Sequence, residues 1–145
     1  MKLIESDIIY AKMDMNDKNH EVASKIFNKI KNKELEVSVT AYSILEIELL
    51  LNTGRIKING KKPSKKEISE WIDTLCIALS NYGIIVEPLT CEDFSKSAQL
   101  RYEHPISFFD SHHAAQAQRT KKGIISFDAV YDYIPEVERI DPNTI

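Results

Sequence analysis

The 145-residue sequence has few residues that cross-link a chain or interrupt its helices and strands: two Cys, four Gly and five Pro. Cys76 and Cys91 are isolated, with no CxxC pair and no His at zinc-finger spacing. This pattern excludes a disulfide scaffold and a structural zinc site. No apolar run approaches the ~20 residues that a transmembrane helix needs. We therefore expect no contact with a membrane.

The first ten residues lack the features of a secretory signal. Glu5 and Asp7 lie inside their only apolar stretch, and no small-residue cleavage site follows. We therefore expect a cytoplasmic protein.

What the sequence does have is the composition of an ordinary globular domain, with 43% hydrophobic and 28% charged residues. This length is sufficient for one domain with a sizeable core. Because no repeat or linker divides the chain, we expect residues 1–145 to fold as one domain.

Positive charge is concentrated in residues 52–67, which hold six Lys and Arg residues and only one acid. The rest of the chain keeps 13 basic and 21 acidic residues, a formal net charge of −8. We interpret residues 52–67 as an exposed basic connection. Such a segment either contacts nucleic-acid phosphates or is simply a solvated loop. The candidate RNA contacts in it are Arg55, Lys57, Lys61 and Lys62.

Short apolar runs alternate with helical patterns along the chain. The runs lack the period-2 alternation of a half-buried strand, which indicates a parallel sheet covered on both faces, an α/β fold. We predict buried strands at residues 3–4, 35–39, 84–86 and 124–125. A further short strand is predicted near residues 137–140. The predicted helices begin near residues 6, 17, 41, 65, 91 and 108.

Several local signals set the helix ends. Thr40 is placed to cap the helix from Ala41 to Leu51, and Gly54 to end it. Ser64 and Glu67 form a capping box before the next helix. Behind that box runs the clearest apolar stripe of the sequence: Ile68, Trp71, Ile72, Leu75, Cys76 and Leu79. This stripe predicts a buried helix face or, around Trp71, a dimer surface.

Four carboxylates follow the predicted strands. Asp7 and Asp128 follow the first and fourth strands, Glu46 lies in the helix after the second, and Asp110 lies in the first turn of a later helix. In open parallel sheets, ligands bind beyond the carboxyl ends of the strands. Asp7, Asp110 and Asp128 each also fit a helix-capping role, but Glu46, in mid-helix, does not. A set of oxygen ligands without basic partners suits a hard cation, Mg²⁺ or Mn²⁺.

These residues carry a resemblance to a known family. The order and setting of four segments resemble those of the PIN-domain ribonucleases, and VapC-type toxins of toxin–antitoxin pairs are the closest group. The segments are Ile4–Asp7, Leu45–Ile47, Phe108–Ala115 and Ile125–Asp128, and the tail from Tyr131 to Pro142 resembles the usual ending of the family.

The resemblance implies a single three-layer domain, with a mainly parallel sheet of four or five strands covered by about seven helices. It implies an endoribonuclease whose quartet, here Asp7, Glu46, Asp110 and Asp128, binds Mg²⁺ or Mn²⁺. An RNA substrate, an antitoxin partner and a homodimer are implied with it. Chemically, divalent cations activate water and shield phosphate charge, so no Ser, Cys or His nucleophile is required.

Other residues near the quartet have more than one reading. Glu46 and Glu48 point about 200° apart on a helix, so only one can face the site; the family pattern favours Glu46. The candidates for the outer shell of the site are Ser6, Ser126, Asp132 and Glu48. His113 shares the face of Asp110 with small residues, so we interpret it as a packed or hydrogen-bonded histidine rather than a ligand.

Three other functions compete with a ribonuclease. An idle PIN-like module that only binds RNA or protein would have no need of four carboxylates. A phosphotransfer domain is disfavoured because Ile9 stands where an aspartate phosphatase has its second Asp. A DNA nuclease would carry the same quartet. We prefer RNA as the substrate because the family that the sequence resembles usually acts on RNA.

Overall fold

A computed structural model describes all residues, 1–145. Its centre is a sheet of five parallel strands in the order β3-β2-β1-β4-β5. The strands are β1 (Lys2–Ile4), β2 (Val37–Thr40), β3 (Ile85–Glu87), β4 (Ile124–Ile125) and β5 (Arg139–Ile140). The first strand of the chain is therefore the central one, paired with β2 on one side and β4 on the other. This arrangement confirms the predicted parallel α/β fold.

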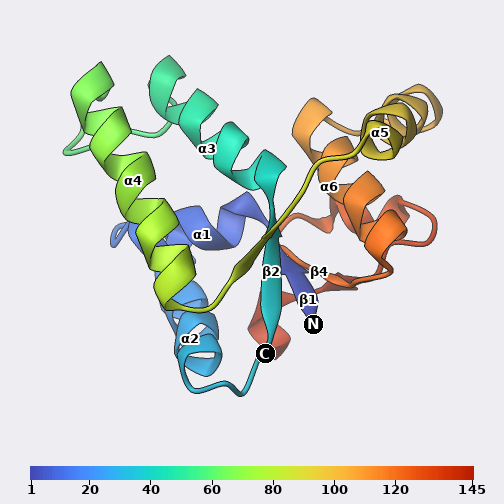
Figure 1. The fold of residues 1–145 in the computed structure, drawn as a ribbon, viewed down its shortest axis with the longest axis horizontal. Coiled ribbons are helices and arrows are strands. Elements are labelled where there is room, and N and C mark those ends of the chain that lie inside the picture. The colour runs from blue at the N-terminus through green and yellow to red at the C-terminus, as the bar shows by residue number, and fades with distance from the viewer.

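Six α-helices cover the sheet, and two short 3₁₀ helices follow β4 and β5. They are α1 (Ser6–Met13), α2 (His20–Lys31), α3 (Ala41–Thr53), α4 (Lys65–Asn81), α5 (Cys91–Glu103), α6 (Phe108–Thr120), η1 (Ala129–Tyr133) and η2 (Pro142–Thr144). Helices α1, α2 and α4 lie on one side of the sheet, and α5 and α6 lie on the other (Figure 1). Helix α3 contacts α1 and α4 as well as α6. None of the helices combines the length and apolarity needed to cross a bilayer.

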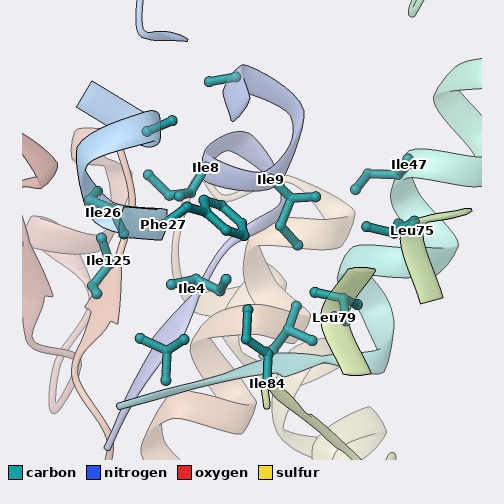
Figure 2. Close-up of a cluster of buried hydrophobic side chains, with 14 of the residues drawn as sticks. Ile4, Ile8, Ile9, Ile26, Phe27, Ile47, Leu75, Leu79, Ile84 and Ile125 are labelled. Atoms are coloured by element: carbon teal, nitrogen blue, oxygen red, sulfur yellow. The ribbon is translucent and has the colours of Figure 1, made fainter. Parts of the chain in front are cut away.

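Successive strand residues point to opposite faces and so build two cores. Leu3 and Ile124 pack with α5 and α6, whereas Ile4 and Ile125 pack with the helices on the other face. Figure 2 shows the larger core, in which Ile4 lies among side chains of α1, α2 and α4. The carboxyl ends of β1 and β4 are thereby fixed between two packed layers.

The predicted helix signals are confirmed in the structure. The Thr40 hydroxyl accepts a hydrogen bond from the Ser43 amide at the start of α3. The box of Ser64 and Glu67 is complete, with both reciprocal hydrogen bonds formed. Gly54 ends α3 in the left-handed conformation, at φ 76°.

Two predicted burials are wrong. β3 is an edge strand, so Ile85 is 54% and Val86 is 41% exposed, and only the preceding Ile84 is buried. An apolar run does not reveal which strand lies at the edge of a sheet. Cys76 is also exposed, because it lies about 100° from Leu75 around α4, at the margin of the stripe that faces the core.

We expect Leu79→Ala to destabilise the protein by about 2–5 kcal/mol, because it removes a buried side chain and leaves a cavity in the larger core. Ile77→Ala is the matched control on α4, since Ile77 is 54% exposed, and should change the free energy of unfolding by about 0.5 kcal/mol or less. Urea unfolding of both variants measures the difference. Equal effects would show that α4 does not pack as described.

Candidate metal centre

The predicted acidic residues meet at the carboxyl end of the sheet. Asp7 lies in the first turn of α1, Glu46 lies in α3, and Asp110 lies in the first turn of α6. Asp128 follows β4 and is the N-cap of η1. These four residues line one open hollow, together with Glu5. The convergence expected from the sheet topology is present, and it includes a fifth carboxylate.

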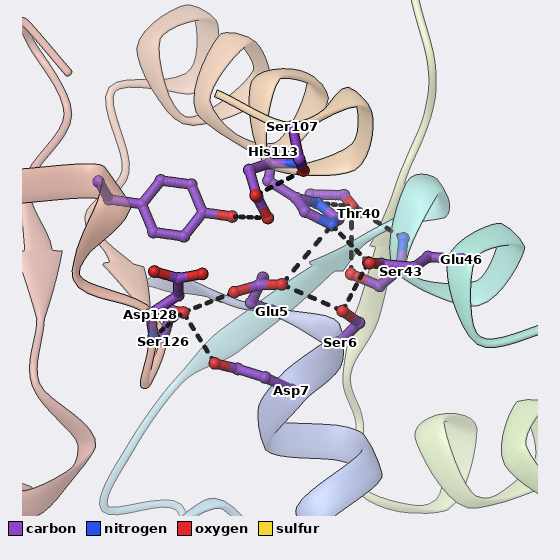
Figure 3. A network of polar contacts seen from close by, with 12 residues as sticks. Glu5, Ser6, Asp7, Thr40, Ser43, Glu46, Ser107, His113, Ser126 and Asp128 are labelled. Carbon is purple, nitrogen blue, oxygen red and sulfur yellow. Dashed lines mark hydrogen bonds and ion pairs between the residues drawn. The ribbon is translucent and has the colours of Figure 1, made fainter. Parts of the chain in front are cut away.

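Glu5 occupies the centre of the group (Figure 3). It directly follows β1, and its side chain is almost fully buried. Its Oε2 lies 2.5 Å from the Ser126 hydroxyl, and its Oε1 lies 3.1 Å from the Ser6 hydroxyl and 3.9 Å from His113 Nε2. Glu5 thus connects segments that are more than a hundred residues apart.

Burial of Glu5 among like charges makes its ionised form unfavourable. Loss of solvation raises the pKa of its carboxyl well above the ordinary value, and the charges of Asp7, Glu46 and Asp110 raise it further. The hydrogen bond from Ser126 opposes this rise. A bound cation would remove the repulsion that the protein leaves uncompensated.

Asp7 has one occupied and one free oxygen. Its Oδ2 accepts hydrogen bonds from the Ser126 hydroxyl at 2.8 Å and from the Phe127 amide at 2.7 Å. Its Oδ1 is buried and has no hydrogen-bond partner. Burial raises the pKa of this carboxyl from 3.8 to about 6, against the lowering effect of the two hydrogen bonds. Asp7 therefore fastens the loop after β4 and keeps an unpartnered acceptor.

The structure places Glu46, and not Glu48, in the acidic group. Glu46 Oε2 lies 2.6 Å from the Ser6 hydroxyl and 3.1 Å from His113 Nε2. Glu48 is exposed and lines a different hollow, between α3 and α4. Glu46, the acid that the family pattern favours, is therefore the one that lines the acidic hollow.

Asp110 and Asp128 lie at helix starts on either side of the hollow. The Ser107 hydroxyl donates to Asp110 Oδ2 at 2.5 Å, and the Tyr131 hydroxyl lies 3.5 Å from Oδ1. Burial raises the pKa of Asp110, and the charge of Asp128 contributes to the rise. Asp128 is exposed and uses Oδ1 to accept from the Val130 amide at 2.9 Å.

Most of the chain matches a known protein family. Residues 3–137 match the PIN domain family. The chain belongs to this family. The resemblance noted in the sequence is thus confirmed, although no curated protein matches the chain.

Solved structures show the same fold at low identity. FitAcB from Neisseria gonorrhoeae is 17% identical, with a TM-score of 0.70 and full coverage of both chains. VapBC2 from Rickettsia felis, bound to a promoter DNA fragment, is 14% identical, with a TM-score of 0.67 and 96% coverage of each chain. The sarcin–ricin loop cleaving toxin VapC20 of Mycobacterium tuberculosis is 18% identical, with a TM-score of 0.68 and coverage of 95% of this chain and 99% of that one.

The remaining predicted residues of this PIN domain lie at different distances from the hollow. Ser6 and Ser126 touch its carboxylates directly. Asp132 instead forms a two-point ion pair with Arg139, whose guanidinium also donates to the Ser126 carbonyl oxygen at 3.2 Å. Asp132 therefore contacts none of the carboxylates of the hollow and is connected to Ser126 through Arg139.

Of the four predicted RNA contacts, only Arg55 lines the acidic hollow. Lys57 lines a separate hollow beside Trp71. Lys61 forms a short antiparallel bridge with Ile58, and the stem of Lys62 lies against Gly54. Arg55 is exposed and forms no ion pair within 4 Å, so its charge is free for a ligand.

Glu5 was not proposed from the sequence. His113 is the buried, hydrogen-bonded histidine that the sequence predicted, but its contact with Glu46 was not. The signal for Glu5 was its position directly after the last residue of the first strand, where the rule for parallel sheets points. No spacing signal singles out His113, because its partners Thr40 and Glu46 belong to a distant segment.

The donors of this PIN domain fit a divalent cation. Ligand atoms of Glu5, Glu46 and His113 lie within 4.8 Å of one another. The unpartnered Oδ1 of Asp7 adds an acceptor that the protein itself does not satisfy. Carboxylate oxygens in this number are typical of Mg²⁺ and Mn²⁺ sites.

We expect Asp7→Asn to stabilise the metal-free protein at pH 7.5. The folded pKa of about 6 exceeds the ordinary 3.8, so the contribution of Asp7 is fully present below pH 4 and is lost as pH rises through 6. The ionised carboxylate therefore costs about 3 kcal/mol above that pH, and Asn carries no such cost.

Urea unfolding in EDTA at pH 4.5 and pH 7.5 tests this expectation. The advantage of Asp7→Asn should be large at pH 7.5 and mostly absent at pH 4.5, whereas exposed Glu48→Gln should change little at either pH. An equal advantage at both values would rule out the titration of Asp7 as its cause.

Proposed function

We propose that this PIN domain is a metal-dependent endoribonuclease that hydrolyses RNA phosphodiester bonds. The observation that carries the proposal is the convergence of five carboxylates on one open hollow, with Glu5 buried at its centre. Burying carboxylates together is costly unless a cation compensates them. No hydrogen bond or ion pair with a Lys or Arg reaches any of the five.

Glu5, Glu46, Asp110 and Asp128 would hold Mg²⁺ or Mn²⁺, with Oδ1 of Asp7 as a further donor. A divalent cation bound there supplies an activated water and shields the charge of the phosphate oxygens. Asp7 also positions Asp128, because it accepts hydrogen bonds from Ser126 and Phe127, the two residues that precede Asp128.

Asp128 is the carboxylate best suited to take the proton of the attacking water. It is the only exposed member of the five, and its Oδ2 has no partner in the protein. A general base must reach the water directly, and a residue at the mouth of the hollow can do so. Asp110, held by Ser107 and Tyr131, is fixed in one orientation and suits a binding role.

We further propose that the protein is the toxin of a toxin–antitoxin pair and acts as a homodimer. The support is the similarity in fold to FitAcB, VapBC2 and VapC20. At 14–18% identity, this similarity extends to the fold alone. An antitoxin would be a separate chain. The RNA substrate would enter over Arg55, the one cation beside the acidic hollow.

Cleavage of total RNA with Mg²⁺, Mn²⁺ or EDTA tests the nuclease. We expect the wild type to cut only with metal, and Glu5→Gln and Asp110→Asn to lose about 100-fold or more of the activity, since each removes a ligand charge but keeps the shape. Glu48→Gln is the matched control and should cut like the wild type.

Two results would contradict the proposal in different ways. If pure wild type, freed of any co-purified inhibitor, never cuts with metal supplied, the domain is an idle binding module. If Glu5→Gln and Asp110→Asn cut as well as the wild type, the carboxylates are structural and the site lies elsewhere.

Arg55→Met is expected to weaken RNA binding without removing catalysis. It keeps the stem and removes the charge beside the hollow, so KM should rise about 10-fold and the slope of binding against salt should fall by about one. Lys66→Met is the control, because Lys66 pairs with Glu70 on the exposed face of α4. If the two variants behave alike, Arg55 has no special place in the RNA path.

A further inference from the structure

A fully buried histidine faces the acidic group. His113 lies on α6, one turn after Asp110, and has no exposed surface. Its Nε2 lies 3.1 Å from Glu46 Oε2 and 3.9 Å from Glu5 Oε1 (Figure 3). The other ring nitrogen, Nδ1, lies 2.9 Å from the Thr40 hydroxyl. The ring is therefore held by the Thr40 hydroxyl at Nδ1, and its Nε2 edge faces two carboxylates, of which Glu46 is within hydrogen-bond distance.

The Thr40 hydroxyl is suited to either form of the neutral ring. It already accepts from the Ser43 amide, and it lies 3.3 Å from the Ser43 hydroxyl. When Nδ1 carries the proton, it donates to Thr40, and Thr40 donates to Ser43. When Nε2 carries the proton, the Thr40 hydroxyl turns and donates to Nδ1. The ring can thus present Nε2 as a donor to Glu46 or as a free lone pair.

The free lone pair is the form that binds metals. Histidines that ligate a metal typically donate their other ring N–H to an oxygen acceptor, and Thr40 supplies that acceptor. In an octahedral site with bonds near 2.1 Å, adjacent ligand atoms lie about 3 Å apart and opposite ones about 4.2 Å apart. The separations from Nε2 to Glu46 and Glu5 fall in this range.

We propose that His113 Nε2 is a direct ligand of the divalent cation, between Glu46 and Glu5. The inference rests on the proposed function, because it concerns the same metal centre. It replaces an all-oxygen site with a mixed nitrogen and oxygen site. Imidazole suits transition metals better than Mg²⁺, which prefers oxygen ligands, so His113 shifts the preference of the centre from Mg²⁺ towards transition metals, for which Mn²⁺ serves as the probe.

Pulsed EPR of the Mn²⁺-loaded protein tests the ligand without any measurement of activity. We expect the modulation of an imidazole ¹⁴N in the wild type, its replacement when histidine is ¹⁵N-labelled, and its loss in His113→Gln. His104→Gln should keep the signal, because the His104 ring makes no hydrogen bond and does not line the hollow. The labelled wild type shows whether a histidine binds the metal even if His113→Gln does not fold, and His113 is the histidine whose ring faces the carboxylates.

Calorimetric titration with Mn²⁺ and with Mg²⁺ supplies a second readout. His113→Gln should weaken Mn²⁺ binding about 10-fold or more and Mg²⁺ binding less, so that the preference for Mn²⁺ falls. Mn²⁺ that binds without nitrogen coupling would overturn the role of His113 and leave the nuclease proposal intact. A wild type that binds neither metal would overturn both.

Discussion

The site depends on a carboxyl group, that of Glu5, held in the interior at the end of the central strand. Removing an anion from water is costly, and the neighbouring acids add repulsion to this cost. The protein supplies hydroxyls from Ser6 and Ser126 and a ring from His113, but no Lys or Arg within reach. The other carboxylates surround this uncompensated negative charge, which a bound divalent cation would neutralise.

Serine hydroxyls set the orientation of the carboxylates. Ser6 reaches Glu46, Ser107 reaches Asp110, and Ser126 lies between Glu5 and Asp7. A hydroxyl has one proton, so Ser126 donates to one of its two carboxylates at a time. Burial raises the pKa values of Glu5 and Asp7, and the hydrogen bond from Ser126 opposes both rises. The side chains are thus held in place while their charge is left for a ligand.

Much of this architecture could be predicted from the sequence, since strands, caps and the breaks between helices are local. Thr40, Ser64 and Gly54 act within one turn of their own position, and their roles are as predicted. The exposure of Ile85 could not be predicted, because an edge strand and a central strand have the same apolar residues. Asp110 and Asp128 were found by their place after a turn or strand, whereas Glu5 was passed over for Asp7, two residues further on. The contacts of His113 arise only from tertiary packing.

The central position of β1 has a consequence for the order in which the protein forms during synthesis. β1 leaves the ribosome first and finds β2 early, but its other neighbour is β4, at Ile124–Ile125. The hydroxyl that holds Glu5 belongs to Ser126, 121 residues later. Long-range pairings of this kind form late because the loop between them must close. A growing chain therefore carries no assembled acidic centre until the segment of Ser126 and Asp128 has been synthesised.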